Sequence, residues 1–219
     1  MTPALPYILP FGAFVAFLAL DHLLPIDPVF VYPLRAVTVT AVLGVFSRKV
    51  IDLRARHVVG SIALGIAVFV IWVGPDVLWP AYRGHWLFQN RITGSVHAEM
   101  PAALKSSLLF IVFRAYGCTI MVPIFEELFW RGWLARWLID SEDFRRIPLG
   151  AYTIFSFWIG SILFASEHGP YWEVGLLAGV AYNAWLRRTR SLGDAILTHA
   201  VTNGCLSAYV LAADKWQYW

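Results

Sequence analysis

The sequence predicts an all-α fold, a polytopic bundle of about seven to eight transmembrane helices. Of its 219 residues, 59% are apolar and 14% are charged, whereas soluble globular proteins have about 45–50% and about 25%. The apolar residues form long blocks and do not alternate with polar ones, which excludes a membrane β-barrel. This length accommodates about seven spans of roughly 20 residues, so we expect a single intramembrane domain over residues 1–219.

Polar or Pro/Gly-containing connections divide the apolar blocks into candidate spans. In chain order the predicted spans are 7–24, 29–46, 60–80, a long block at 104–139, 152–168, 172–186 and 193–213. The connections between them are Pro25 to Pro28, the basic segment 47–59, the polar loop 81–103, Asp140–Gly150, Gly169-Pro170 and Arg187–Ser191. Proline, glycine and charged residues are typical of such breaks, because they interrupt helices or oppose insertion into lipid.

The block 104–139 is too long for one straight span. Its 36 residues would extend about 54 Å at about 1.5 Å per residue, against a hydrocarbon core about 30 Å thick. The block is therefore either one long helix kinked near Gly117 and Pro123, or two helices.

The distribution of basic residues favours a single crossing. If the block crosses once, nine loop Lys and Arg residues lie on one side of the membrane and three on the other. If it crosses twice, the split is five to seven and the bias disappears. The nine are Arg48, Lys49, Arg54, Arg56, Arg145, Arg146, Arg187, Arg188 and Arg190. Basic loops are enriched on the cytoplasmic side, so we expect seven spans and a cytoplasmic N-terminus.

Ionisable residues inside apolar spans are the informative ones, because each is costly in the bilayer. The first cluster contains Glu126, Glu127 and Arg131. Glu127 and Arg131 are spaced i,i+4 and are expected to form a structural ion pair. Glu126 points about 100° away from Glu127 and has no cation nearby in the sequence. A buried carboxylate without such compensation suits a general base.

The second cluster is Glu167-His168, at the end of a span. If the spans on either side of loop 140–151 are antiparallel, Glu126 and His168 lie about 20 and about 24 Å from that loop. We therefore expect these two side chains to meet, and Glu167 to point elsewhere.

The third cluster is His199 and Asn203, spaced i,i+4 inside an apolar span. Two polar side chains on one helix face either hold neighbouring helices together or direct two donors at one point, as an oxyanion requires.

Together these clusters predict a polar cavity inside the bilayer, with two chemistries open. Glu126, His168 and His199 form a potential His₂Glu zinc site. Alternatively, a carboxylate and a histidine activate water beside a separate oxyanion hole. No serine is spaced to be activated by a base.

The ordered motifs Glu126-Glu127-x-x-x-Arg131, Phe164-x-x-x-His168 and His199-x-x-x-Asn203 resemble the CAAX protease and bacteriocin-processing (CPBP, Abi) family. These intramembrane endopeptidases are related to the type II CAAX prenyl endopeptidase of eukaryotes. The three motifs occur in family order on separate apolar spans, and none departs visibly from the family pattern. The Thr-Arg-Ser-Leu stretch at 189–192 and the aromatic segment 216–219 further resemble a bacterial subgroup that accompanies exosortase (PEP-CTERM) sorting systems.

The resemblance implies a role for each motif residue. Glu126 would activate the hydrolytic water with assistance from His168, while His199 and Asn203 would stabilise the oxyanion. Glu127 and Arg131 would hold the geometry. Family members have been discussed both as metalloproteases and as glutamic proteases. Asn203 suits an oxyanion hole better than a metal shell, so we expect no cofactor, with zinc as the open alternative.

The predicted function is hydrolysis of a peptide bond near the C-terminus of a membrane-anchored or lipidated protein. The expected partners are that protein or peptide substrate and the lipid bilayer, with no nucleic acid. The expected location is the bacterial inner membrane. The rival hypothesis is a non-catalytic membrane protein, such as a small transporter or an assembly or immunity factor, whose buried polar groups bind an ion or stabilise packing. Convergence of Glu126, His168, His199 and Asn203 on one cavity would favour the protease.

Overall fold

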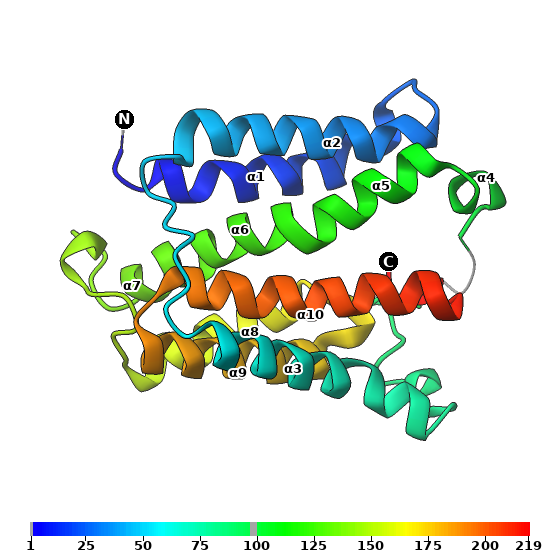
Figure 1. Cartoon of the computed structure of the whole chain (residues 1–219). Helices are drawn as coiled ribbons and strands as arrows, with labels where there is room; N and C mark the ends of the chain where they lie inside the picture. The colour runs from blue at the N-terminus through cyan, green and yellow to red at the C-terminus, as the bar shows by residue number, and fades with distance from the viewer. Residues whose placement is uncertain (1, 97–99) are drawn as a thin grey trace.

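Helices dominate the computed structural model, which describes residues 2–96 and 100–219 (Figure 1). The α-helices are α1 Leu5–Leu20, α2 Pro28–Val42, α3 Val58–Leu78, α4 Ala102–Lys105, α5 Leu108–Tyr116, α6 Val122–Glu127, α7 Ala135–Trp137, α8 Ile154–Ser166, α9 Trp172–Thr189 and α10 Leu192–Ala213. Three π-helical segments, Leu43–Ser47, Gly117–Met121 and Leu128–Leu134, adjoin them. Within the described residues there is no β-strand, which agrees with the predicted all-α class.

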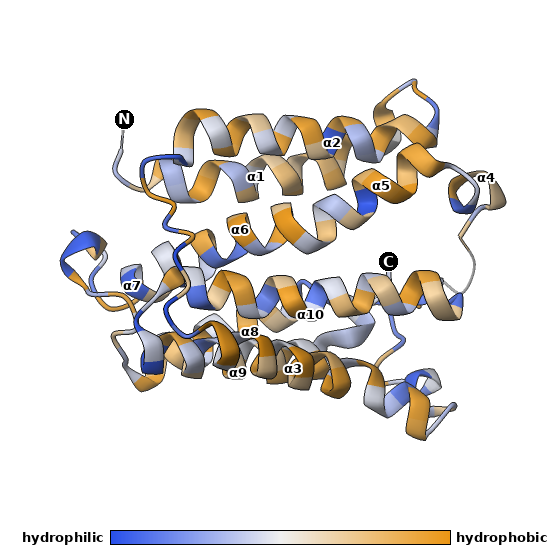
Figure 2. Ribbon diagram, in the orientation of Figure 1, coloured by the Kyte–Doolittle hydropathy of each residue, from blue (hydrophilic) through white to orange (hydrophobic). Residues whose placement is uncertain are grey.

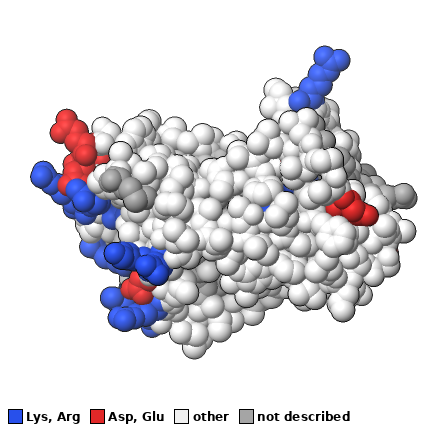
Figure 3. Space-filling model, turned by 90° about the horizontal axis from the view of Figure 1, so that it is seen from above, with Lys and Arg blue, Asp and Glu red and all other residues white. Residues whose placement is uncertain are grey.

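In the described part of the chain, seven helical segments run back and forth between two ends of the molecule (Figure 1). One end, here called the basic end, holds the connections 48–57, 138–153 and 190–191. The opposite end holds residues 79–96 and the segment after α10. Figure 3 shows Lys and Arg gathered at the basic end, and a band between the two ends that is nearly free of charged atoms on the face shown.

The helices have the length and composition of membrane spans. Four helical segments are long and apolar enough to cross a bilayer: Pro28–Ser47, Val58–Leu78, Leu108–Trp137 and Leu192–Ala213. α1 and α8 are shorter apolar helices, and most of the helical ribbon in Figure 2 has the colour of hydrophobic residues. The chain is an integral membrane protein, a polytopic helical bundle.

The block predicted at 104–139 forms one crossing, not two helices. Residues Leu108–Trp137 are continuously helical over 30 residues. The helix begins at Ser107, whose Oγ accepts a hydrogen bond from the Phe110 N–H at 3.2 Å, so 104–107 lie outside the span. A π turn begins at Gly117, where any Cβ would collide with the Tyr32 ring. Pro123 follows this wider turn, which accommodates a residue that donates no backbone hydrogen bond.

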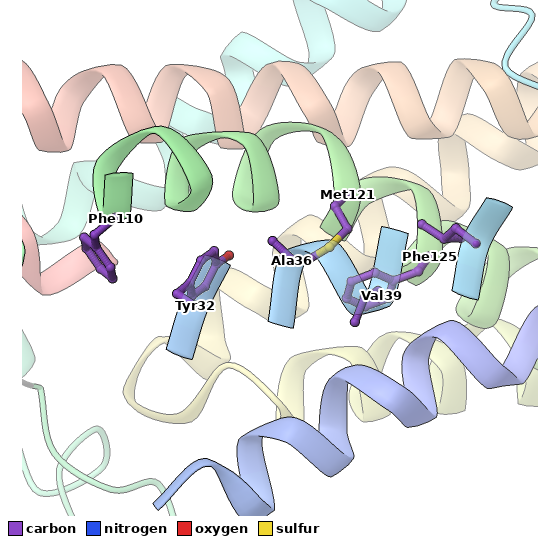
Figure 4. Close-up of a cluster of buried hydrophobic side chains, with 7 residues drawn as sticks. Tyr32, Ala36, Val39, Phe110, Met121 and Phe125 are labelled. Atoms are coloured by element: carbon purple, nitrogen blue, oxygen red, sulfur yellow. The ribbon is translucent and has the colours of Figure 1, made fainter. Parts of the chain in front are cut away.

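A hydrophobic cluster joins α2 to the α5–α6 segment (Figure 4). Its residues recur every three or four positions on α2, so they form one face of that helix. Side chains of the long segment face this side of α2. The cluster consists of Tyr32, Ala36, Val39, Leu43, Phe110, Met121 and Phe125. This packing holds α6 in place, and α6 carries Glu126 and Glu127.

Helix α10 packs closely on α3 and is anchored at the basic end. A Cβ on Gly65 would clash with the Thr198 carbonyl, and the Thr202 hydroxyl donates to the Gly65 carbonyl at 3.0 Å, so glycine permits this close approach. Asp194 is fully buried. It accepts hydrogen bonds from the His57 backbone N–H at 2.8 Å and from the Ser61 hydroxyl at 3.2 Å. These contacts fix the start of the helix that carries His199.

Helix α8 ends earlier than the sequence predicts. It stops at Ser166, and His168 lies just beyond it, before Gly169 with its left-handed φ of 53°. Thirteen residues of helix rise only about 20 Å, which is less than the thickness of the hydrocarbon core. His168 therefore lies at a depth that side chains from the middle of the long segment can reach.

Candidate active site

Glu127 binds two partners from different helices through one carboxylate oxygen, whereas its Oε2 is buried without a hydrogen-bond partner among the described residues. Its Oε1 accepts from Arg131 Nη1 at 3.1 Å and from His199 Nδ1 at 2.9 Å, and its side chain is 0% exposed. The i,i+4 ion pair that the sequence predicts is thus present, and it also orients His199 on α10.

Arg131 connects this pair to α9. Its Nε donates to Asn183 Oδ1 at 2.9 Å and its Nη2 donates to the Gly179 carbonyl at 3.3 Å. Asn183 in turn donates to the Ser161 hydroxyl on α8 at 2.9 Å. The Glu127–Arg131 pair therefore holds together four helical segments around the site.

Glu126 has a different environment from its neighbour. It is 8% exposed, and its Oε2 is buried without a hydrogen-bond partner among the described residues. No ion pair to Glu126 occurs in this part of the chain, and Arg131 bonds to Glu127 instead. The carboxylate expected from the sequence to lack compensation does lack it.

The two histidines are both oriented through Nδ1. The His168 Nδ1–H donates to the Phe164 carbonyl at 2.7 Å, which leaves Nε2 with the lone pair. The Trp72 ring lies at a steep angle to His168, with the ring centres 5.2 Å apart. His199 stacks on Tyr182 with a centre distance of 5.0 Å and uses Nδ1 for Glu127. In each ring Nε2 is the nitrogen free of these contacts.

Asn203 lies one turn beyond His199 on α10. Its Nδ2 donates to the Cys118 carbonyl at 2.9 Å, and Cys118 belongs to the π turn Gly117–Met121. An amide nitrogen carries two hydrogens, so one remains for another acceptor.

These four side chains converge on one cavity of about 150 Å³. Glu126, His168, His199 and Asn203 all line this space, here called the polar cavity, whereas Glu127 and Arg131 do not. Aromatic and apolar side chains, including Trp72, Phe164 and Tyr182, form much of the wall. The cavity is large enough for water molecules and combines a base, two imidazoles and an amide donor.

Within residues 2–96 and 100–219, no group of three His, Cys, Asp or Glu side chains is placed to hold one metal ion. Glu126, His168 and His199 all line the polar cavity.

Sequence reasoning missed several residues of the site. Asn183 was detectable, because an amide inside an apolar span is costly unless it is bonded, yet it has no motif around it. The walls formed by Trp72 and Tyr182 give no such signal, since aromatic residues are common throughout this chain. Tyr218 and Trp219, which also line the polar cavity, are brought there only by tertiary folding.

Comparison with known proteins finds a similarity over the part of the chain that carries the candidate active site. Residues 108–205 match a protein-family model described as type II CAAX prenyl endopeptidase Rce1-like. No curated protein and no solved structure matches the chain. The matched stretch runs from the first residue of α5 into α10, and so contains every motif residue that the sequence singled out. Over these residues the chain is similar to the CAAX protease family of intramembrane endopeptidases, which supports the resemblance seen in the motifs.

Proposed function

We propose that this chain is a glutamate-dependent endopeptidase that cleaves near the C-terminus of a membrane-anchored or lipidated protein. The observation that supports it most strongly is the carboxylate of Glu126. It is buried without a partner among the described residues and lines the cavity that also receives His168, His199 and Asn203. Because a buried carboxylate without a partner is costly, its presence favours a chemical role.

The proposed reaction uses these groups in sequence. Glu126 removes a proton from water as the water oxygen attacks the scissile carbonyl carbon, and His168 Nε2 accepts the second hydrogen bond of that water. His199 donates to the oxyanion through Nε2–H, and Asn203 donates its remaining amide hydrogen. When the C–N bond breaks, Glu126 returns the proton to the leaving amine. Water is consumed, and a carboxylic acid and an amine are released.

Glu127 and Arg131 have a positioning role in this proposal. The bond from His199 Nδ1 to Glu127 fixes the direction of Nε2, as a carboxylate fixes the imidazole in other hydrolases. Arg131 holds Glu127 in place and neutralises its charge.

We test the proposal with the purified protein in lipid nanodiscs and a mixture of lipid-anchored fluorogenic peptides. The variant Glu126→Gln keeps the shape of the side chain and should lower turnover by about 10²–10⁴-fold, the usual contribution of a general base. The matched control is Glu142→Gln, at an exposed loop position, which should retain full turnover. Undiminished turnover by the Glu126→Gln protein would reject the proposal in favour of a non-catalytic role.

The mechanism is proposed to need no cofactor, and a chelator separates the alternatives. Turnover should be unchanged after prolonged treatment with 1,10-phenanthroline. Loss of turnover that added zinc restores would instead assign the reaction to a metalloprotease.

We further propose that the basic end faces the cytoplasm in the bacterial inner membrane, with the N-terminus on that side. The clustering of Lys and Arg at that end supports this orientation (Figure 3). Single-cysteine variants in a background without Cys118 and Cys205 test it. Ser166→Cys, beside the site, should react with an impermeant maleimide from outside, whereas the matched Ser141→Cys should not. The reverse pattern would invert the orientation.

A further inference from the structure

A second cavity, of about 370 Å³, lies between α2 and α5, close to the polar cavity. It contains two arginines from membrane-spanning helices, Arg35 and Arg114, together with Asp21 and Tyr32. We call it the arginine cavity. Phe110 and Tyr32, both labelled in Figure 4, form part of its wall. Neither arginine belongs to the motifs of the candidate active site.

The arginine cavity contains more positive than negative charge from the described residues. Arg35 is 5% exposed and pairs with Asp21 at 2.7 Å. Arg114 has no carboxylate within ion-pair distance in residues 2–96 and 100–219 and instead lies over the Tyr32 ring at 4.7 Å. The Nε atoms of both arginines are buried without a hydrogen-bond partner there. A guanidinium inside a span is costly without an anion, so this site suits a monovalent anion.

The arginine cavity and the polar cavity lie along the same face of the long segment. On the long segment, the residues that line the two cavities occur every four positions. Phe110 and Arg114 line the arginine cavity. Cys118, Val122 and Glu126 line the polar cavity. The π turn Gly117–Met121, which contains Cys118, keeps these residues aligned, because it has more residues per turn than an α-helix.

Two further contacts place the cavities next to each other. Trp219 lines both cavities. The hydroxyl of Tyr32, from the arginine cavity, lies 3.9 Å from the Cys118 sulfur, from the polar cavity.

We propose that the arginine cavity binds the C-terminal carboxylate of the peptide whose scissile bond lies at Glu126. A carboxylate supplies one negative charge and two acceptor oxygens, which match the planar donors of a guanidinium. Arg114 and Glu126 are twelve residues apart, or about 18 Å along the helix. An extended peptide covers that distance with about five residues. This inference rests on the proposed function and adds an anchor for the fragment that is released.

The binding test uses the Glu126→Gln protein in phosphatidylcholine nanodiscs, so that no cleavage interferes. The probe is a mixture of palmitoylated, dansyl-labelled randomised heptapeptides, prepared as free acids and as C-terminal amides. The free acids should bind about tenfold more tightly than the amides, as expected for a charge-assisted contact. Arg114→Gln should remove this preference, Arg114→Lys should retain part of it, and the exposed control Arg91→Gln should leave it unchanged.

Several outcomes would overturn the inference. Equal binding of the free acids and the amides would overturn the inference. This comparison needs no arginine variant, so the test stays valid even if Arg114→Gln fails to fold. Persistence of the preference in Arg114→Gln would place the carboxylate elsewhere. Loss of the preference in phosphatidylglycerol nanodiscs would identify a lipid phosphate as the occupant instead.

Cleavage by the protein with Glu126 intact separates this inference from the proposed function. Mass spectrometry of the products should show released fragments of about five residues from the free acids, as the extended-chain length requires, and slower release from the amides. Glu126-dependent cleavage of acids and amides at equal rates would support proteolysis and reject the carboxylate site. Preferential binding of acids without any cleavage would retain the anion site and reject proteolysis.

Discussion

Glu126 and Glu127 are adjacent in the sequence, but their carboxylates lie in different surroundings. Glu127 faces Arg131 and His199, accepts a hydrogen bond from each and is sealed from solvent. Glu126 faces the polar cavity and, among the described residues, forms neither an ion pair nor a hydrogen bond through its side chain, whereas Glu127 forms both through Oε1. One helix turn thus carries a compensated carboxylate, which stabilises the bundle, and an uncompensated one, which is available for chemistry.

Arg131→Leu should have the largest effect on stability, because it removes the cation from a buried pair and leaves Glu127 charged. Breaking such a pair costs about 3–5 kcal/mol. Denaturant unfolding in micelles should show this loss in the free energy of unfolding. The double variant Glu127→Leu, Arg131→Leu should recover part of it, because no buried charge remains. A single variant as stable as the unsubstituted protein would remove the distinction between the two carboxylates.

Asn203→Asp should act on the chemical step, because the substituted side chain is nearly isosteric but has no amide hydrogen for an oxyanion. Removing one such donor typically lowers kcat by about 10²–10³-fold. We expect this fall with little change in KM, measured with a lipid-anchored peptide substrate. A change confined to KM would indicate that Asn203 contacts the ground state and not the transition state.

Asp194→Asn tests a third buried carboxylate, at the basic end of α10, and we expect it to have the smallest effect of these variants. Asp194 is buried like Glu126, but the His57 backbone and Ser61 both donate to it. Replacing the carboxylate with a neutral amide weakens these hydrogen bonds and should lower the free energy of unfolding by about 1.5 kcal/mol. The shift of the unfolding midpoint measures this loss. Turnover per folded molecule should stay the same. A selective loss of kcat would show that this carboxylate also supports the reaction.

The sequence predicts much of the fold because apolar blocks and their Pro, Gly and charged boundaries report directly on membrane insertion. It also indicates the Glu127–Arg131 pair, which depends only on helical spacing, and the approach of Glu126 to His168, which depends on depth. It does not predict the π turns, since these reflect packing such as that of Tyr32 on Gly117. Nor does it identify Asn183 or Arg114, because a single polar residue in a span does not reveal what lies opposite it.

The π turn at Gly117–Met121 has a consequence for how this chain tolerates change. A wider turn takes in an extra residue, so winding the same residues as an ordinary α-helix would rotate everything downstream by about 100°. Glu126 would then move away from His168 and Asn203, although every motif residue would still be present. The winding of this short stretch is thus under as tight a constraint as the identity of the reactive side chains.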